Sequence, residues 1–222
     1  ISSFITRSKE DTLESMIMNI NMIKNLSKNI NIKFLKKIIF ISSVDVYGSN
    51  YKNKINENNK VNPFSYYGLS KFASEIILKK YFSKIPLVIL RLPGVYGQND
   101  KKLSIIGKLY HEAINNRKIM IYNKGSQLRD YIKVTDVSMI IEIFLNKSFE
   151  GVYNIVSGKS FSIVEIAKII ISNLDNNIEI IDNKSNSVSY DLVFDNSKFT
   201  SIFPNFVFTN IHKGIEEYIN NL

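Results

Sequence analysis

The spacing of apolar residues divides the first half of the chain into alternating helices and strands. Between residues 11 and 29, apolar side chains recur every three or four positions, which predicts an amphipathic helix. Short apolar, β-branched runs at 38–42 and 87–91 predict buried strands. A second helix is predicted over 65–82, and the Asn- and Lys-rich stretch 51–61 before it predicts a polar loop. This order is typical of an α/β protein.

The alternation becomes looser from about Gly97 onward, which indicates that a smaller region branches off the main sheet. Ser162 and Glu165 stand at the two ends of a capping box, and they predict the start of a helix that runs to Leu174. In this half of the chain we also expect helices at 103–115, 135–145 and 211–222 and strands at 118–122, 152–156 and 178–181.

Composition excludes several classes of protein. The 222 residues are 45% hydrophobic, enough to bury a core in one or two domains. No cysteine is present, which excludes disulfides and thiolate metal sites, and His111 and His212 are too far apart in the sequence to suggest a metal. No apolar run approaches the roughly 18 residues that span a bilayer, and no signal peptide is evident. We therefore expect a cytoplasmic protein with no membrane partner.

The net charge of +9 raises the question of nucleic-acid binding. The positive residues are almost all lysines, spread along the chain among Asn and Ile, with no basic stripe and no RNA-binding signature. We therefore expect no nucleic-acid partner. A modest positive field favours an anionic substrate instead.

The candidate chemistry begins with Tyr67 and Lys71, which are four residues apart on the predicted helix 65–82 and so share one face. A tyrosine is neutral until about pH 10, and bringing its pKa near 7 takes roughly 4 kcal/mol of phenolate stabilisation. A neighbouring lysine and a cationic nicotinamide can supply that. Taken alone, the pair is better explained by a helix-surface lysine beside a packed tyrosine, so its context decides.

Four further blocks give that context. Residues 37–48 contain an apolar run that ends in Ser42 and Ser43, as expected of a buried strand that opens into a site at its carboxyl end. Residues 86–97 contain a second such strand followed by a Pro-Gly turn, and blocks at 125–137 and 151–158 follow. Together with 63–75 and in this order, they resemble the extended branch of the short-chain dehydrogenase/reductase superfamily, which contains nucleotide-sugar epimerases, dehydratases and reductases.

The resemblance implies a role for each matching residue. Tyr67 would be the catalytic base and acid, Ser43 would share the sugar hydroxyl proton, and Lys71 would bind the nicotinamide ribose and lower the pKa of Tyr67. The same resemblance implies NAD or NADP as the cofactor and a nucleotide-diphosphate sugar as the substrate. The implied cofactor-binding residues are Asn19, Ser42, Tyr67, Lys71 and Pro93, and the implied substrate-binding residues are Ser43, Tyr67, Gly94, Met120, Tyr122 and Arg129.

Arg129 would grip the diphosphate, a task that suits a bidentate guanidinium. The alternative for this arginine is a structural ion pair with Asp130 or Asp136. No metal ligand is implied.

The implied fold is a Rossmann-like doubly wound parallel sheet with a smaller C-terminal α/β substrate-binding region. Residues 1–97 would be the remainder of the dinucleotide-binding domain, and 98–222 mainly the substrate-binding region, with about 134–160 returning to the main sheet. The sequence lacks the glycine-rich loop that holds the dinucleotide pyrophosphate in this family. We therefore expect a truncated chain that lacks about 80 residues, the length of two βαβ units, and binds dinucleotide weakly. A homodimer through the helices 11–29 and 65–82 is expected for the full-length protein.

Three departures narrow the implied reaction. A 4,6-dehydratase needs an acid/base pair after Ser43, but Val44 and Asp45 stand there, and valine cannot donate a proton. Gly94 replaces the asparagine that usually contributes a substrate hydrogen bond, and the usual second diphosphate arginine is absent from 186–195. We therefore expect an NAD(P)-dependent epimerase that oxidises the sugar transiently at C4. The alternatives are a reductase of a 4-keto sugar nucleotide and a non-catalytic remnant.

Overall fold

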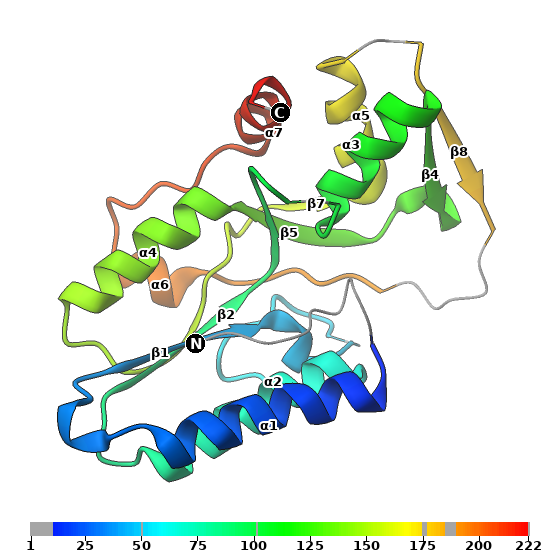
Figure 1. Cartoon of the computed structure of the whole chain (residues 1–222). Coiled ribbons are helices and arrows are strands. Elements are labelled where there is room, and N and C mark those ends of the chain that lie inside the picture. Colours follow the sequence, from blue (N-terminus) through cyan, green and yellow to red (C-terminus); the bar gives the residue numbers. More distant parts are fainter. Residues whose placement is uncertain (1–10, 50, 101, 175–176, 185–189, 222) are drawn as a thin grey trace.

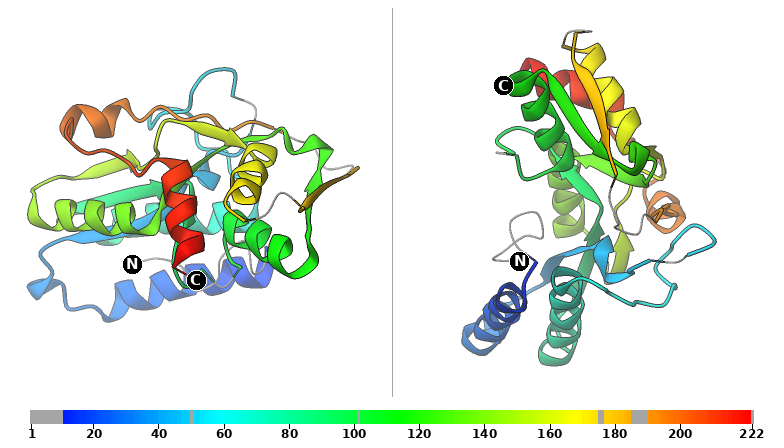
Figure 2. Two further views of the ribbon diagram at one scale, coloured as in Figure 1. Left: turned by 90° about the horizontal axis from the view of Figure 1, so that it is seen from above. Right: turned by 90° about the vertical axis from the view of Figure 1, so that its right-hand side faces the viewer.

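The main sheet consists of three parallel strands with helices on both faces (Figure 1). The computed structural model describes residues 11–49, 51–100, 102–174, 177–184 and 190–221. The strand order is β1–β2–β6, and α1 and α2 lie side by side beneath the sheet while α4 and α6 cover the other face (Figures 1 and 2). These elements are α1 (Leu13–Asn29), β1 (Ile38–Ser43), α2 (Tyr66–Tyr81), β2 (Leu87–Leu92), α4 (Val134–Asn146), β6 (Gly151–Asn154) and α6 (Ser197–Ile202).

The alternation of side chains along β2 explains how one strand serves two cores. Leu87 and Ile89 pack with α1 and α2 on one face, whereas Val88, Leu90 and Leu92 pack with α4 and α6 on the other. Successive side chains of a strand point to opposite faces, so a strand covered on both sides is apolar along most of its length, and in β2 the buried Arg91 is the exception. The continuous apolar run in the sequence reflects this double burial.

A second, smaller region lies against the first and has its own core. Its strands β4 and β8 pair in parallel, and α3, α5 and α7 pack around them. A three-stranded sheet of β3, β5 and β7 joins the two regions: within β5, Tyr131 enters the core of the smaller region and Ile132 enters that of the main sheet. The bounds are β3 (Gly94–Tyr96), α3 (Ile105–Asn116), β4 (Lys118–Tyr122), β5 (Leu128–Lys133), β7 (Ser160–Ser162), α5 (Ile163–Ser172), β8 (Glu179–Asn183) and α7 (Ile211–Asn220), with short 3-10 turns η1 (Ile32–Phe34), η2 (Val44–Val46) and η3 (Asn123–Gly125).

The predicted helices and strands are present, with ends that differ by a few residues. The strands β3, β5 and β7 and the helix α6 were not expected. The reason is that β3 and β7 are each three residues long and α6 six, while Arg129 and Asp130 interrupt the apolar pattern of β5. The polar loop predicted at 51–61 contains one core residue: Ile55 is fully buried, and its backbone is hydrogen-bonded to Val193 and Asp195.

In the described part of the chain, no helix has both the length and the apolar character that crossing a membrane requires. Within the same residues, no group of three or more histidine, aspartate or glutamate side chains is placed to hold a metal ion.

Candidate functional site

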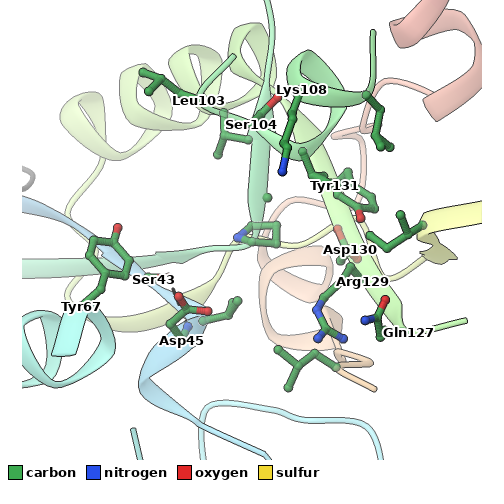
Figure 3. A pocket seen from close by; sticks show the side chains of 18 of the residues that line it. Ser43, Asp45, Tyr67, Leu103, Ser104, Lys108, Gln127, Arg129, Asp130 and Tyr131 are labelled. Atoms are coloured by element: carbon green, nitrogen blue, oxygen red, sulfur yellow. Dashed lines mark hydrogen bonds between the residues drawn. The ribbon is translucent and has the colours of Figure 1, made fainter. Parts of the chain in front are cut away.

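A cavity of about 690 Å³ lies where the carboxyl ends of β1 and β2 face the smaller region (Figure 3). Parallel α/β sheets bind ligands at this edge, because the loops after the strands diverge there. Its walls are the turn after β1, the start of α2, the turn after β2, the start of α3, and strands β4 and β5. All six predicted substrate-binding residues line this cavity, together with Pro93 from the predicted cofactor set: Ser43, Tyr67, Gly94, Met120, Tyr122 and Arg129.

The first turn of α2 carries Tyr67 to the cavity wall. Ser65 caps the helix by accepting a hydrogen bond from the Gly68 amide, and Asp11 accepts one from the Tyr67 amide at 2.8 Å. Gly68 allows η2 to approach the helix, since a Cβ at this position would lie 2.6 Å from the backbone oxygen of Asp45. This close approach brings the turn after β1 to the same wall as Tyr67 (Figure 3).

Lys71 lies one turn further along α2, behind the cavity wall, and its residue is only 2% exposed. Its ammonium donates to the carbonyl of Ile41 at 2.6 Å and lies 5.6 Å from the centre of the Tyr67 ring. Burial lowers the pKa of Lys71 to about 8, and the nearby Glu75 carboxylate opposes this shift. Lys71 is therefore still mostly charged at neutral pH, and it faces the tyrosine that the sequence paired with it.

Of the other predicted residues in the main-sheet region, Ser43 lines the cavity, whereas Ser42 and Asn19 do not. Ser43 lies on the cavity wall, and its Oγ accepts a hydrogen bond from the Asp45 amide at 3.1 Å. Ser42 does not line the cavity: its hydroxyl donates to Glu75 at 2.6 Å. Asn19 is also buried and donates to the Ser70 hydroxyl at 3.4 Å, which links α1 to α2.

Arg129 enters the cavity from β5 and is held by backbone carbonyls. Its Nη1 donates to the oxygen of Leu128 at 2.7 Å and to that of Tyr190 at 2.6 Å, and the guanidinium lies 5.0 Å from the centre of the Tyr190 ring. Both hydrogen bonds use Nη1, so the rest of the Arg129 guanidinium is left for the cavity that the residue lines (Figure 3). Burial lowers the pKa of Arg129, and the nearby tyrosines oppose the shift.

The alternative of an ion pair with Asp130 or Asp136 was wrong, because both carboxylates accept hydrogen bonds from other segments. Asp130 accepts from the Ser157 amide and hydroxyl and from the Gly158 amide, at 2.9–3.0 Å, and Asp136 accepts from the Thr209 amide and hydroxyl. Burial raises the pKa of Asp130 to about 6, and its hydrogen bonds to Ser157 and Gly158 oppose this. Asp130 thus anchors the turn before β7 while it lines the cavity.

Several cavity residues escaped the sequence analysis. Lys108 projects its ammonium into the cavity from α3, facing the wall that carries Arg129, and Gln127 lies beside that arginine (Figure 3). Nothing in the sequence distinguishes Lys108 from the other lysines; only the packing of α3 against β4 and β3 brings it here. Lys102, Lys108 and Arg129 give the cavity three cationic side chains, and Asp45 and Asp130 give it two carboxylates.

Curated proteins are similar to part of this chain. The dTDP-D-glucose 4,6-dehydratase of Dictyostelium discoideum is 32% identical over 152 residues, which cover 62% of this chain and 35% of that protein. The putative UDP-glucose 4-epimerase of Methanocaldococcus jannaschii is 34% identical over 142 residues, 61% of this chain and 46% of that protein. The chain thus spans less than half of the length of these curated relatives.

Solved structures share the fold. An NAD-dependent NDP-hexosamine 5,6-dehydratase of tunicamycin biosynthesis, TunA, superposes with a TM-score of 0.86 at 18% identity, covering all of this chain and 76% of that one. The dTDP-glucose 4,6-dehydratase of Bacillus anthracis, crystallised with NAD, gives 0.75 at 23% identity, covering 93% and 65%. The predicted Rossmann-like fold is confirmed. The model of the family described as NAD dependent epimerase/dehydratase matches residues 2–156, more than half of the sequence, and the chain therefore belongs to that family.

Proposed function

We propose that this chain carries the proton-transfer and sugar-nucleotide residues of an NAD(P)-dependent nucleotide-sugar epimerase. The observation that supports it is the convergence of Ser43, Tyr67 and Arg129 on one cavity, although they come from three elements far apart in sequence. In this proposal residues 1–97 serve the nicotinamide end and 98–222 mainly the nucleotide sugar, with 134–160 completing the main sheet.

Tyr67 acts as the base that takes the proton of the sugar C4 hydroxyl and later returns it. Ser43 shares that proton through a hydrogen bond and keeps the hydroxyl directed at the phenol. Lys71 stabilises the phenolate, because its ammonium lies 5.6 Å from the centre of the Tyr67 ring and a nearby positive charge lowers the pKa of a phenol. This attraction contributes to the roughly 4 kcal/mol needed to bring a tyrosine pKa near 7.

The residues present fit the nicotinamide end of a dinucleotide. Among the described residues, Lys71 has a single hydrogen-bond partner, so further N–H donors of its ammonium remain for a ribose hydroxyl. Pro93 shares the cavity wall with Tyr67 and contributes an apolar surface. The cofactor, when bound, supplies hydride acceptance and return at the sugar carbon.

Arg129 binds the substrate diphosphate, and Lys108 faces it from α3 as a second cation. The carbonyl anchors of Arg129 fix its fork before the ligand arrives, which reduces the entropy lost on binding. Met120 and Tyr122 on β4 lie on the same side and contact the nucleotide. The cavity is large enough for a sugar nucleotide, since pockets for ligands of this size are about 300–1,000 Å³.

The turn after β1 favours epimerisation over elimination of water. Val44 is 6% exposed and has no titratable group, so the position next to Ser43 supplies no acid to a leaving hydroxide. Asp45 is the only carboxylate that this described turn offers to the cavity. An oxidised C4 intermediate would therefore be reduced again rather than dehydrated.

Binding and turnover on this chain test the proposal. Calorimetry with UDP-glucose and dTDP-glucose should show binding that Arg129→Met weakens and Tyr67→Phe preserves. Because the chain is expected to bind dinucleotide weakly, NAD is added in large excess; chromatography should then detect the C4 epimer, and Tyr67→Phe should abolish it. A folded chain that binds neither sugar nucleotide would overturn the proposal. Accumulation of a 4-keto product that has lost water would instead establish a dehydratase.

We also propose that a second copy of the chain packs against the outer face of α1 and α2. Leu13 and Ile17 on α1 and Leu69 and Ile76 on α2 are each 40–46% exposed, an apolar surface next to the site. Light scattering after size exclusion should give a dimer mass, and Ile17→Glu should shift it to a monomer. A monomer in the unsubstituted chain would exclude this arrangement.

A further inference from the structure

A buried ionic cluster lies behind the cavity wall, formed by Ser42 on β1, Glu75 on α2 and Arg91 on β2. Arg91 binds both oxygens of Glu75, with Nε to Oε1 at 3.0 Å and Nη2 to Oε2 at 2.7 Å. The Ser42 hydroxyl donates to Oε1 at 2.6 Å. Glu75 is 0% and Arg91 3% exposed, so the carboxylate receives three donors with no access to water.

The cluster is costly if its only role is to join three elements. Removing two charges from water is expensive, and apolar side chains of similar volume often hold a core equally well. Arg91 also lies 4.8 Å from the centre of the Tyr47 ring, whose hydroxyl donates to Asn154. The buried charge of Glu75 therefore points to a neighbouring residue whose own charge depends on it.

That neighbour is Lys71. Glu75 lies one turn beyond Lys71 on the same face of α2, and consecutive residues of β1 bind them: Ile41 accepts from Lys71 and Ser42 donates to Glu75. The other groups around the ammonium are the rings of Phe40 and Tyr67.

Among the described residues, Glu75 is the carboxylate whose charge raises the Lys71 pKa. The charged group from β2 is Arg91, which is paired with Glu75. From α1 the uncharged Asn19 contacts α2, and just before α1 Asp11 accepts a hydrogen bond from the Tyr67 amide at the start of α2.

We propose that Ser42, Glu75 and Arg91 form a positioning cluster for Lys71, in which the fixed carboxylate keeps the buried ammonium charged and directed at Tyr67. This inference rests on the proposed function for the role of Lys71, but it assigns to Ser42 a task different from cofactor binding. Burial alone lowers the pKa of Lys71 toward 7, and the charge of Glu75 opposes this shift. Without Glu75 a larger fraction of Lys71 would be neutral at pH 7, and the phenolate would lose its counter-charge.

The test is the titration of Lys71 in the chain without substrate or cofactor. Lysine labelled with ¹³C at Cε reports its protonation by NMR, and the Lys71 signal is the one that disappears in Lys71→Arg. Glu75→Gln should lower the Lys71 pKa by about one pH unit, since a neighbouring opposite charge shifts a pKa by one to three units. Glu75→Asp, which keeps the charge, should restore most of that shift.

Two further variants make the test decisive. Glu75→Gln combined with Arg91→Met removes both members of the buried ion pair, so Arg91 is not left without its partner. The double variant therefore replaces the single variant if that one fails to fold, and it should also lower the Lys71 pKa. Ser74→Ala is the matched control, because Ser74 is buried on the same helix but donates only to the Ser70 carbonyl. It should leave the titration unchanged.

The proposal is overturned if Lys71 titrates at its original pH in folded Glu75→Gln or in the double variant. It is also overturned if Glu75→Asp and Glu75→Gln shift the Lys71 pKa equally, since a purely structural role does not distinguish charge. Because no ligand is needed, the cluster can be established even if the chain binds no sugar nucleotide. Failure of the epimerase proposal and failure of this one therefore give different results.

Discussion

The buried carboxylate of Asp130 should make the stability of this protein depend on pH in an unusual direction. Asp130 is 2% exposed, and burial raises its pKa from the ordinary 3.8 to about 6 despite the hydrogen bonds from Ser157 and Gly158. Between these two pH values the folded chain holds a proton that the unfolded chain releases. The free energy of unfolding therefore falls as pH rises through this window.

The magnitude follows from the size of the shift. About two pKa units at about 1.4 kcal/mol each give roughly 3 kcal/mol of stability that is fully present below pH 3.8 and lost above about pH 6. Most paired carboxylates act in the opposite direction, because their folded-state pKa is depressed and their stability is lost on acidification. Asp130→Asn has no titrating group at this position, so comparison with the variant isolates the contribution.

Urea unfolding followed by circular dichroism, at intervals from pH 4 to pH 7.5, measures both proteins. The stability of the natural chain minus that of Asp130→Asn should fall by about 2.5 kcal/mol across this range. Glu216→Gln, on an exposed position of α7, controls for the loss of one negative charge. A difference that stays constant within the error of the linear extrapolation would refute the reasoning and place the Asp130 pKa near its ordinary value.

The site and its support yield three more predictions. Lys108→Met and Arg129→Met should each weaken UDP-glucose binding about tenfold or more in calorimetry, since a charge-assisted hydrogen bond contributes roughly 1.5–3 kcal/mol. A variant that binds UDP-glucose as tightly as the natural chain would show that its residue does not bind the diphosphate. Arg91→Met should lower the free energy of unfolding by about 3–5 kcal/mol in urea titrations, because it leaves the buried Glu75 unpaired, and adding Glu75→Gln should recover most of that loss. A loss below about 1 kcal/mol would mean that Glu75 is not left unpaired. Gly68→Ala should displace η2, because its Cβ would lie 2.6 Å from a backbone oxygen, and lower stability by about 1–3 kcal/mol in the same assay. No loss would show that this turn is free to move.

Local regularities were readable in the sequence because they depend on neighbours a few residues away. A helical period at 11–29, the doubly buried β2 and the capping box at Ser162 each specify their element without reference to the rest of the chain. The pairing of Tyr67 with Lys71 belongs to the same class, since positions four apart on a helix share a face wherever that helix lies.

The weaker elements were decided by tertiary packing. Strand β5 carries Arg129 and Asp130 within a buried segment, a pattern that becomes stable only when Tyr190, Ser157 and Gly158 provide partners for the two charged groups. Ile55 likewise looks like a residue of a polar loop until Phe194 pairs beside it. Partners brought from tens of residues away leave no local period to detect.

The site shows the same division. The sequence alone supplied the chemical types, the Tyr67–Lys71 spacing and the resemblance that placed Ser43 and Arg129 in one site. The tertiary structure decided that Ser42 turns away to Glu75 and that Lys108 enters the cavity. The physical reason is that side-chain direction depends on which face each element buries, and this is fixed only when the sheet, α2 and the smaller region pack together.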